Sequence, residues 1–334
     1  MSGRIAGFDL LRGIAIGLVM LRHALPEAFP GAGVVGVVMF FALSGYLITG
    51  VLLAELAGAG RVDLRRFYLR RARRLVPALL LLVVGVVLVT LTLDPLGDRD
   101  QLGKTVAVAL TWTGNLPFGH ASDATFHLWT LATEEQFYLL WPAVLALAFA
   151  RGRVGVALVG VACACLAACV ATVVWLAEAP DLAYSLPTSW AVCFVVGAAT
   201  RVYRDRLDAV PLPPWTPAVA LLGLTLLSVI PLRGHALTYL AGGPAIALLT
   251  AVLLVCWRAW TQVTGPVLGA LVWLGTVSYA AYLWNYPLTV WLRPHLEHAG
   301  LVAAVLTLPL AALSWYAVER PLQPRPRPRE AVAA

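Results

Sequence analysis

The chain has 334 residues, of which 60% are hydrophobic and only 12% are charged. This charged share is about half that of an ordinary soluble domain, and a soluble chain of this length could not bury so much apolar surface. The composition excludes a soluble protein and predicts an all-α, polytopic integral membrane protein. We attribute the net charge of +7 to membrane topology and expect no nucleic-acid partner.

A membrane-spanning helix needs about 20 mostly apolar residues. Ten runs meet this requirement: 8–25, 33–54, 75–93, 126–150, 154–177, 182–200, 215–232, 236–257, 267–292 and 299–318. Residues 105–119 are too few to span, which favours a re-entrant or interfacial segment. The first run contains Asp9 and lacks a following small-residue cleavage site, so we interpret it as a retained helix and not as a signal peptide.

Basic residues are distributed unevenly between the two sides that ten spans define. Of the 24 Lys and Arg residues, 18 fall on the side of the termini, four fall on the opposite side and two lie within the first run. The positive-inside rule therefore predicts cytoplasmic termini in the cell membrane. We expect one transmembrane domain over residues 1–323 and a disordered, Pro- and Arg-rich cytoplasmic tail over 324–334, without an appended soluble domain.

The cysteines favour no chemistry. All five lie inside apolar runs, their number is odd, and none has metal-ligand spacing with a histidine. They are Cys163, Cys165, Cys169, Cys193 and Cys256. We expect them to be small buried hydrophobes, with no disulfide, no metal site and no tightly bound cofactor.

The first run carries ionisable side chains at a spacing that places them on one face. Arg12 and His23 are eleven residues apart, which is 20° past three helical turns, and about 16 Å along the axis. Asp9 precedes Arg12 by one turn and can pair with it. Anchoring at the two membrane interfaces would also explain these side chains. Ionisable residues within a membrane are costly, however, and this favours a functional site.

A second polar stripe opens the run at 126–150. On a continuous helix His127, Thr130, Glu134 and Tyr138 would share one face. An interfacial belt would explain Trp129 and Tyr138, but it would not explain two adjacent glutamates followed by Gln136. The stripe therefore indicates a set of buried proton donors and acceptors.

A third feature is the basic segment 65–74, directly before a predicted span. Its arginines include Arg70, Arg71, Arg73 and Arg74. Positive-inside anchoring or contact with anionic lipid explains the segment fully. A guanidinium cluster also suits a polyanionic phosphate ligand, so both interpretations stay open.

Taken together, these motifs resemble the membrane-bound acyltransferase-3 family. Residues 8–13 with His23 resemble its Arg-x10-His element, and residues 40–47 resemble its Phe-Phe-x-Leu-Ser-Gly-Phe-Leu segment. The basic residues 70–77, the block from His127 to Pro142, and residues 278–287 and 319–321 match further elements in the same order. One departure stands out, because Asn285 occupies the usual histidine of a Trp-His-x-Pro element. An amide cannot transfer a proton, so Asn285 is left out of the catalytic set.

The resemblance implies transfer of an acyl group, most simply acetyl, from cytoplasmic acyl-CoA to a hydroxyl of a sugar, glycoside or other small alcohol. Within that reaction we expect His23 to be the general base and Glu134 to orient it or relay its proton. An acyl-histidine intermediate is the open alternative. The resemblance implies that Arg70, Arg71, Arg73 and Arg74 hold coenzyme A phosphates while the pantetheine arm passes Arg12.

The remaining expected contacts belong to the acceptor side. We expect His127, Trp129, Gln136 and Tyr138 to line the acceptor or oxyanion site. Ser44 and Gly45 either allow close approach of the substrate or simply pack helices together. Membrane lipid is the other expected partner. The rival interpretation is a transporter or flippase in which Arg, His and Glu form a substrate or proton path. A purely structural subunit would leave the polar face unexplained.

Overall fold

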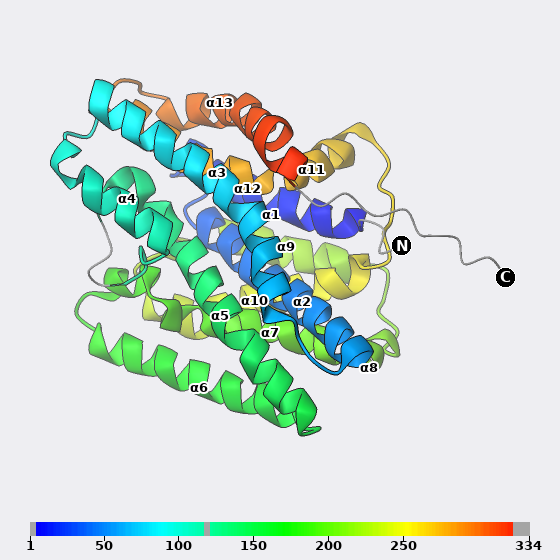
Figure 1. Cartoon of the computed structure of the whole chain (residues 1–334). Helices are drawn as coiled ribbons and strands as arrows, with labels where there is room; N and C mark the ends of the chain where they lie inside the picture. The colour runs from blue at the N-terminus through cyan, green and yellow to red at the C-terminus, as the bar shows by residue number, and fades with distance from the viewer. Residues whose placement is uncertain (1–4, 117–120, 323–334) are drawn as a thin grey trace, which may run out of the picture.

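The computed structural model describes residues 5–116 and 121–322, and all regular secondary structure within them is helical (Figure 1). The longer α-helices are α1 (Ala6–Ala24), α2 (Ala32–Ala59), α3 (Leu64–Thr92), α5 (Trp129–Ala150), α6 (Val154–Trp175), α10 (Gly243–Trp257), α12 (Ser278–Leu292) and α13 (Ala299–Leu313). The shorter α-helices are α4 (Leu102–Thr111), α7 (Ala191–Val202), α8 (Arg204–Asp208), α9 (Thr216–Ser228), α11 (Pro266–Thr276) and α14 (Arg320–Leu322). The tail predicted at 324–334 lies outside the described residues.

Short 3-10 and π-helical segments complete the fold. The 3-10 segments are η1 (Arg99–Gln101), η2 (Asp123–Leu128), η3 (Pro180–Ser185) and η4 (Pro187–Ser189). Two π-helical segments, η5 (Thr238–Gly242) and η6 (Ser314–Glu319), extend α10 and α13.

Several helices have the length and apolarity of membrane spans. Among the described residues these are α2, α3, α6, the continuous helix 238–257 and the continuous helix 299–322, which makes five; α11 with α12 makes six if that bent pair is one broken span. The chain is therefore an all-α, multi-pass membrane protein. Helices α1 and α5 are also long, but charged and polar side chains such as Asp9, Arg12 and Glu134 lower their hydropathy.

The structure corrects three predicted boundaries. Helix α3 begins at Leu64, where the Asp63 side chain accepts a hydrogen bond from the Arg66 amide, so the basic segment is the first part of this helix. In the run 182–200 the α-helix begins only at Ala191, after the proline-containing η3 and η4. The run 267–292 is not one straight helix, because α11 and α12 are bent by 80°. The bend allows α11 to pack along α1 while α12 packs on α13 and η2.

The predicted non-spanning segment 105–119 corresponds to α4. This helix has ten residues, which is too few to cross a membrane, and it packs beside α3 and η2. Residues 117–119 of that segment lie outside the described part of the chain.

Helix α2 lies at the centre of the bundle. It packs against α7, α1 and α10, whereas α6 and α13 lie at opposite edges (Figure 1). In its most apolar 18-residue window 56% of the residues of α2 are buried, against 11% in α6. The exposed side chains of α6 include Val156, Val159 and Trp175. An apolar outward face of this kind is suited to lipid and not to water.

A glycine sets the distance between α2 and α7. A Cβ atom on Gly45 would lie 2.0 Å from the main-chain oxygen of Phe194. Only glycine permits this approach of two helix backbones, as at other small-residue helix contacts in membranes. Gly45 therefore packs helices, and the adjacent Ser44 has a different role, described below.

Candidate active site

Helix α1 presents its ionisable residues at two separate cavities. Near its start, Arg12 Nη1 donates to Asp9 Oδ1 at 3.1 Å, as predicted from their spacing, and the Asp9 side chain is buried. Arg12 lines one cavity, and His23, near the end of the same helix, lines another. The two residues are about 16 Å apart along the axis, so α1 connects the two cavities.

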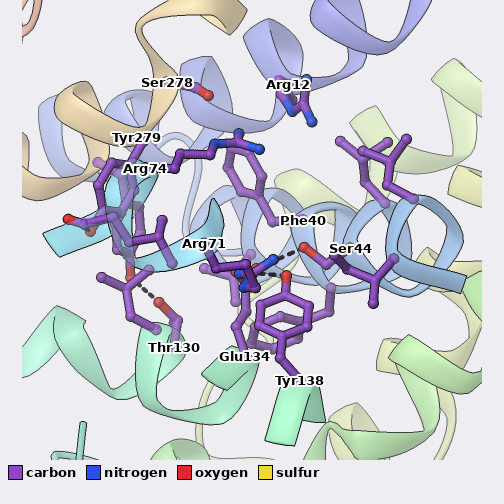
Figure 2. Close-up of a pocket in the computed structure, with 18 residues that line it drawn as sticks. Arg12, Phe40, Ser44, Arg71, Arg74, Thr130, Glu134, Tyr138, Ser278 and Tyr279 are labelled. Atoms are coloured by element: carbon purple, nitrogen blue, oxygen red, sulfur yellow. Dashed lines mark hydrogen bonds between the residues drawn. The ribbon is translucent and has the colours of Figure 1, made fainter. Parts of the chain in front are cut away.

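The first cavity, called here the arginine cavity, contains guanidinium groups from two helices. It encloses about 830 Å³ of empty space, part of it open to solvent. Arg12 comes from α1, and Arg71 and Arg74 come from α3 (Figure 2). Its other polar lining residues are Ser44, Thr130, Glu134, Tyr138, Ser278, Tyr279 and Tyr282. Three guanidinium groups facing one space give it the chemistry of an anion site.

Glu134 is fixed within this cavity through both carboxylate oxygens. Ser44 Oγ donates to Oε1 at 3.1 Å, and Tyr138 Oη donates to Oε2 at 3.2 Å (Figure 2). Tyr138 lies one turn after Glu134 on α5, as the spacing predicted, and Ser44 approaches from α2. These bonds hold the carboxylate in one orientation.

Arg71 is fixed as firmly as Glu134. Its Nη2 lies 3.1 Å from Glu135 Oε1, and its guanidinium carbon lies 3.3 Å from the centre of the Tyr138 ring. An ion pair and a cation–π contact hold a cation more firmly than either contact alone. The adjacent glutamates therefore have different partners: Glu134 pairs with hydroxyls and Glu135 with a guanidinium group.

The structure divides the four predicted phosphate-binding arginines into two pairs. Arg71 and Arg74 line the arginine cavity, but Arg70 and Arg73 do not. Arg70 lies 3.9 Å from Glu55 Oε2 at the surface, and Arg73 is exposed. Residues three apart on a helix share a face, whereas residues one apart diverge by 100°. The cluster therefore has one face toward the cavity and one away from it.

The second cavity, called here the histidine cavity, lies at the junction of α1, α12 and α13. It has about 1050 Å³ of empty space, part of it open to solvent, and its ionisable lining residues are His23, Glu27, Arg293, Glu297 and His298. His23 Nδ1 lies 2.7 Å from Asn285 Oδ1, and the Tyr286 ring packs edge-on at 5.3 Å. Asn285, which sequence reasoning excluded, thus contacts the predicted base directly.

The expected contact between Glu134 and His23 is not present. Glu134 bonds to Ser44 and Tyr138 in the arginine cavity, whereas His23 bonds to Asn285 in the histidine cavity. Their sequence patterns placed both in polar stripes, but neither pattern determines how α1 and α5 pack together. Glu134 therefore does not orient the imidazole of His23.

Aromatic rings connect the two cavities. Tyr282 lines the arginine cavity, and its ring centre lies 5.4 Å from that of His127. The ring centre of His127 lies 5.1 Å from that of Tyr286. Tyr286 in turn contacts His23. Tyr282 and Tyr286 are one turn apart on α12, so this helix forms a wall of both cavities.

His127 belongs to this ring series and not to the face of α5 that bears Glu134. It lies in η2, whose three residues per turn move it off the face predicted for a continuous α-helix. Its side chain is buried. The imidazole lies near the backbone of Leu283, but neither ring nitrogen has a partner that meets hydrogen-bond geometry within the described chain.

Two other predicted site residues contact neither cavity. Gln136 and Asn115 exchange amide hydrogen bonds of 2.8 and 2.9 Å, which ties α5 to the segment after α4. Trp129 is buried against Phe41, Tyr184 and Trp190. Both residues stabilise the framework around the site.

Comparison with known proteins identifies the family. The acyltransferase-3 family, described as an acyltransferase domain, matches residues 5–319. The chain is 29% identical to "Putative peptidoglycan O-acetyltransferase YrhL" of Bacillus subtilis, over 96% of this chain and 55% of that protein. It is 27% identical to peptidoglycan O-acetyltransferase OatA of Listeria monocytogenes, over 96% of this chain and 56% of that protein.

A third relative aligns over a shorter region. O-acetyltransferase OatA of Staphylococcus aureus is 37% identical over 42% of this chain and 24% of its own length. The chain spans about half the length of the first two relatives named above. No solved structure shows significant similarity to it. Because the family match covers nearly all of the chain, the protein belongs to the acyltransferase-3 family.

Proposed function

We propose that this chain moves an acyl group, most simply acetyl, from acyl-CoA in the arginine cavity to a hydroxyl group in the histidine cavity. The observation that carries this proposal is the arrangement of the two cavities on α1. Arg12, Arg71 and Arg74 provide positive charge at one, and His23 provides an imidazole at the other. A donor with several phosphates suits the first, and proton abstraction from a hydroxyl suits the second.

The reaction uses His23 as general base. One imidazole nitrogen takes the proton of the acceptor hydroxyl while the hydroxyl oxygen attacks the thioester carbonyl. The carbon–sulfur bond then breaks, coenzyme A leaves as the thiolate, and the imidazolium returns the proton to it. The pantetheine arm covers the distance along α1 between the phosphates and His23, beside the ring series of Tyr282, His127 and Tyr286.

The acceptor in this proposal is a hydroxyl-bearing saccharide. The histidine cavity combines the carboxylates of Glu27 and Glu297 with the guanidinium of Arg293, which offers both acceptors and donors to hydroxyl groups. The named relatives are O-acetyltransferases, two of them described as acting on peptidoglycan. Those names support a cell-envelope sugar as the first acceptor to test. The family match also weighs against the transporter interpretation.

The proposed topology has about ten crossings, with both termini in the cytoplasm. Contacts between loops support it. On the predicted cytoplasmic side Arg258 pairs with Asp208, and the Gly7 amide donates to Trp260 O. On the opposite side Arg233 pairs with Asp181. In this topology the shorter helices α7 and α9 complete the crossings together with the segments that flank them.

Reporter fusions test this topology. A reporter fused at Ala334 should give a cytoplasmic signal, and one inserted near Asp98 should give a signal from the opposite face, because the basic residues divide 18 to four. Reports from one and the same side would contradict the ten-span arrangement.

The activity test uses purified protein in sealed liposomes. Labelled acetyl-CoA is supplied on the side of the arginine cavity and a soluble saccharide on the other, and the acetylated product is measured by mass spectrometry. Transfer that depends on both substrates supports the proposal. The opposite result would be uptake of the saccharide into the vesicles with no acetylated product, by protein that is shown to bind acetyl-CoA. That result would support the transporter alternative instead.

A further inference from the structure

Asn285 occupies the position where the family resemblance expects a histidine, and it lies between two helices. Its side chain is fully buried, with His23 of α1 on one side and Thr307 of α13 on the other. It does not line the arginine cavity and takes no part in donor binding as proposed above. The hydrogen bonds around it have only one consistent direction.

Thr307 on α13 determines which atoms donate and which accept in these hydrogen bonds. Thr307 Oγ1 donates its single hydrogen to the main-chain oxygen of Ala303 at 2.6 Å. It can therefore only accept from Asn285, whose Nδ2 lies 3.1 Å away. This fixes the orientation of the amide, so Asn285 Oδ1 is the atom that faces His23 Nδ1 at 2.7 Å. An amide oxygen accepts and cannot donate, which requires the hydrogen on Nδ1.

We infer that Asn285 is a positioning residue that holds neutral His23 in the tautomer with Nδ1 protonated and Nε2 free to accept a proton. This inference rests on the proposed role of His23 as general base. The chain Ala303–Thr307–Asn285–His23 does with neutral groups what a carboxylate does for other catalytic histidines, where the partner of one ring nitrogen decides which tautomer is present.

Two further contacts restrict His23, one at its imidazole ring and one at its backbone. Tyr286, next to Asn285 on α12, packs edge-on against it at 5.3 Å between ring centres. At Gly300, the second residue of α13, an added Cβ would lie 2.0 Å from the main-chain oxygen of His23. The backbone, the ring plane and Nδ1 of His23 are thus each fixed by a neighbouring element.

The charged groups near His23 come from several elements. Arg22 and Arg293 act on the imidazole electrostatically. Glu27, Glu297 and His298 line the same cavity, and His127 lies beyond Tyr286. Within the described residues none of these groups is hydrogen-bonded to His23, so Asn285 provides the bond that selects the tautomer.

The first test compares two replacements of Asn285 in the full-length chain. Asn285→Asp keeps an acceptor oxygen for Nδ1–H, whereas Asn285→Leu has a similar size and removes it. We expect Asn285→Leu to lower kcat about 10- to 100-fold, the usual cost of removing a partner that orients a histidine, with the KM for acetyl-CoA unchanged. Asn285→Asp should retain most of the turnover.

A purely structural role gives the opposite order. Burying an extra carboxylate costs more than burying leucine, so packing alone would make Asn285→Asp the worse variant. Normal turnover in Asn285→Leu, or lower turnover in Asn285→Asp than in Asn285→Leu, would overturn the inference.

Thr307 offers a second variant with a matched control. Thr307→Val removes the group that orients the Asn285 amide and should lower kcat several-fold. Thr250→Val is the control, because Thr250 is equally buried and also donates to the carbonyl four residues earlier, at 2.8 Å, but it does not contact Asn285. Equal kcat losses in the two variants would assign Thr307 to helix packing alone and overturn the proposed chain.

The tautomer is observed directly by ¹⁵N NMR of histidine-labelled protein, with the His23 signals assigned by their absence in His23→Gln. We expect a protonated Nδ1 and an unprotonated Nε2, and a mixture of tautomers in Asn285→Leu. A protonated Nε2 in the wild-type protein would overturn the inference. The NMR measurement does not depend on enzymatic activity, so it tests the tautomer separately from the proposed function. Failure of the proposed function would instead appear as normal turnover in His23→Gln.

Discussion

The two cavities of this protein are built from different kinds of interaction. At the arginine cavity a charged side chain is held by close contacts, because Arg71 forms an ion pair with Glu135 and a cation–π contact with the Tyr138 ring. In the histidine cavity, the catalytic candidate is held by neutral groups, Asn285 and Tyr286. Charge provides long-range attraction for a polyanion, whereas a base needs a fixed proton position. The difference suggests a division between binding the donor at one end of α1 and proton transfer at the other.

The largest expected effect is at His23. His23→Gln removes the base but leaves Arg12, Arg71 and Arg74, so acetyl-CoA binding should survive while kcat falls ~10² to 10⁴-fold, the scale of a general base. The measurement is steady-state turnover together with acetyl-CoA binding to the same protein. Near-normal turnover in folded His23→Gln would show that His23 is not the base, and His127 would become the next candidate.

The arginines of α3 provide the next comparison. Arg74→Ala should raise the KM for acetyl-CoA roughly ten- to a hundredfold, because removal of one charge-assisted contact costs about 1.5–3 kcal/mol. Among the described residues Arg74 forms no ion pair, so this change breaks no salt bridge in the fold. Arg71→Ala should act in the same direction but also leaves Glu135 without its partner.

Arg70→Ala and Arg73→Ala are the matched controls on the same helix. Both side chains lie outside the arginine cavity, so the KM for acetyl-CoA should stay within about twofold of wild type, the range of a surface charge. Equal increases in KM for all four variants would mean that the cluster acts through its total charge and not through the face identified here.

A smaller effect, on stability alone, is expected from the amide pair of Asn115 and Gln136. Gln136→Ala leaves the fully buried Asn115 without two hydrogen bonds, which should cost about 1–3 kcal/mol of unfolding free energy. The change should lower the thermal unfolding midpoint in detergent and leave kcat and both KM values intact. A selective rise in the acceptor KM would return Gln136 to the acceptor site predicted from the sequence.

Local spacing predicted the contacts that lie within one helix. The Asp9–Arg12 pair and the shared face of Glu134 and Tyr138 follow from one helical turn each, and the structure shows a hydrogen bond within each pair. The same reasoning failed for His127, because helix α5 begins at Trp129 and η2 before it has a different number of residues per turn. A pattern of polar residues does not reveal where a helix changes its pitch.

Contacts between helices were not predictable in the same way. The pairing of His23 with Asn285, 262 residues later, depends on how α1, α12 and α13 pack. The available signal was chemical: an asparagine and a threonine buried within apolar runs need partners. Asn285 cannot carry a proton itself, but its amide can orient the group that carries the proton.

The smallest expected effect tests whether Ser44 acts through Glu134. Ser44→Ala removes the hydrogen bond to Glu134 Oε1 but leaves the bond from Tyr138 to Oε2, so the carboxylate loses one of two constraints. A hydrogen bond to a charged group contributes about 1.5–3 kcal/mol, but Tyr138 still holds the carboxylate, so we expect only a two- to tenfold change in the KM for acetyl-CoA. The control is Thr49→Val on the same helix, where the buried hydroxyl accepts from Trp141 Nε1 outside the arginine cavity. Thr49→Val should lower stability by a similar amount without changing this KM. If both variants change stability and neither changes the KM, Ser44 belongs to helix packing together with Gly45, and the donor site is confined to the arginines.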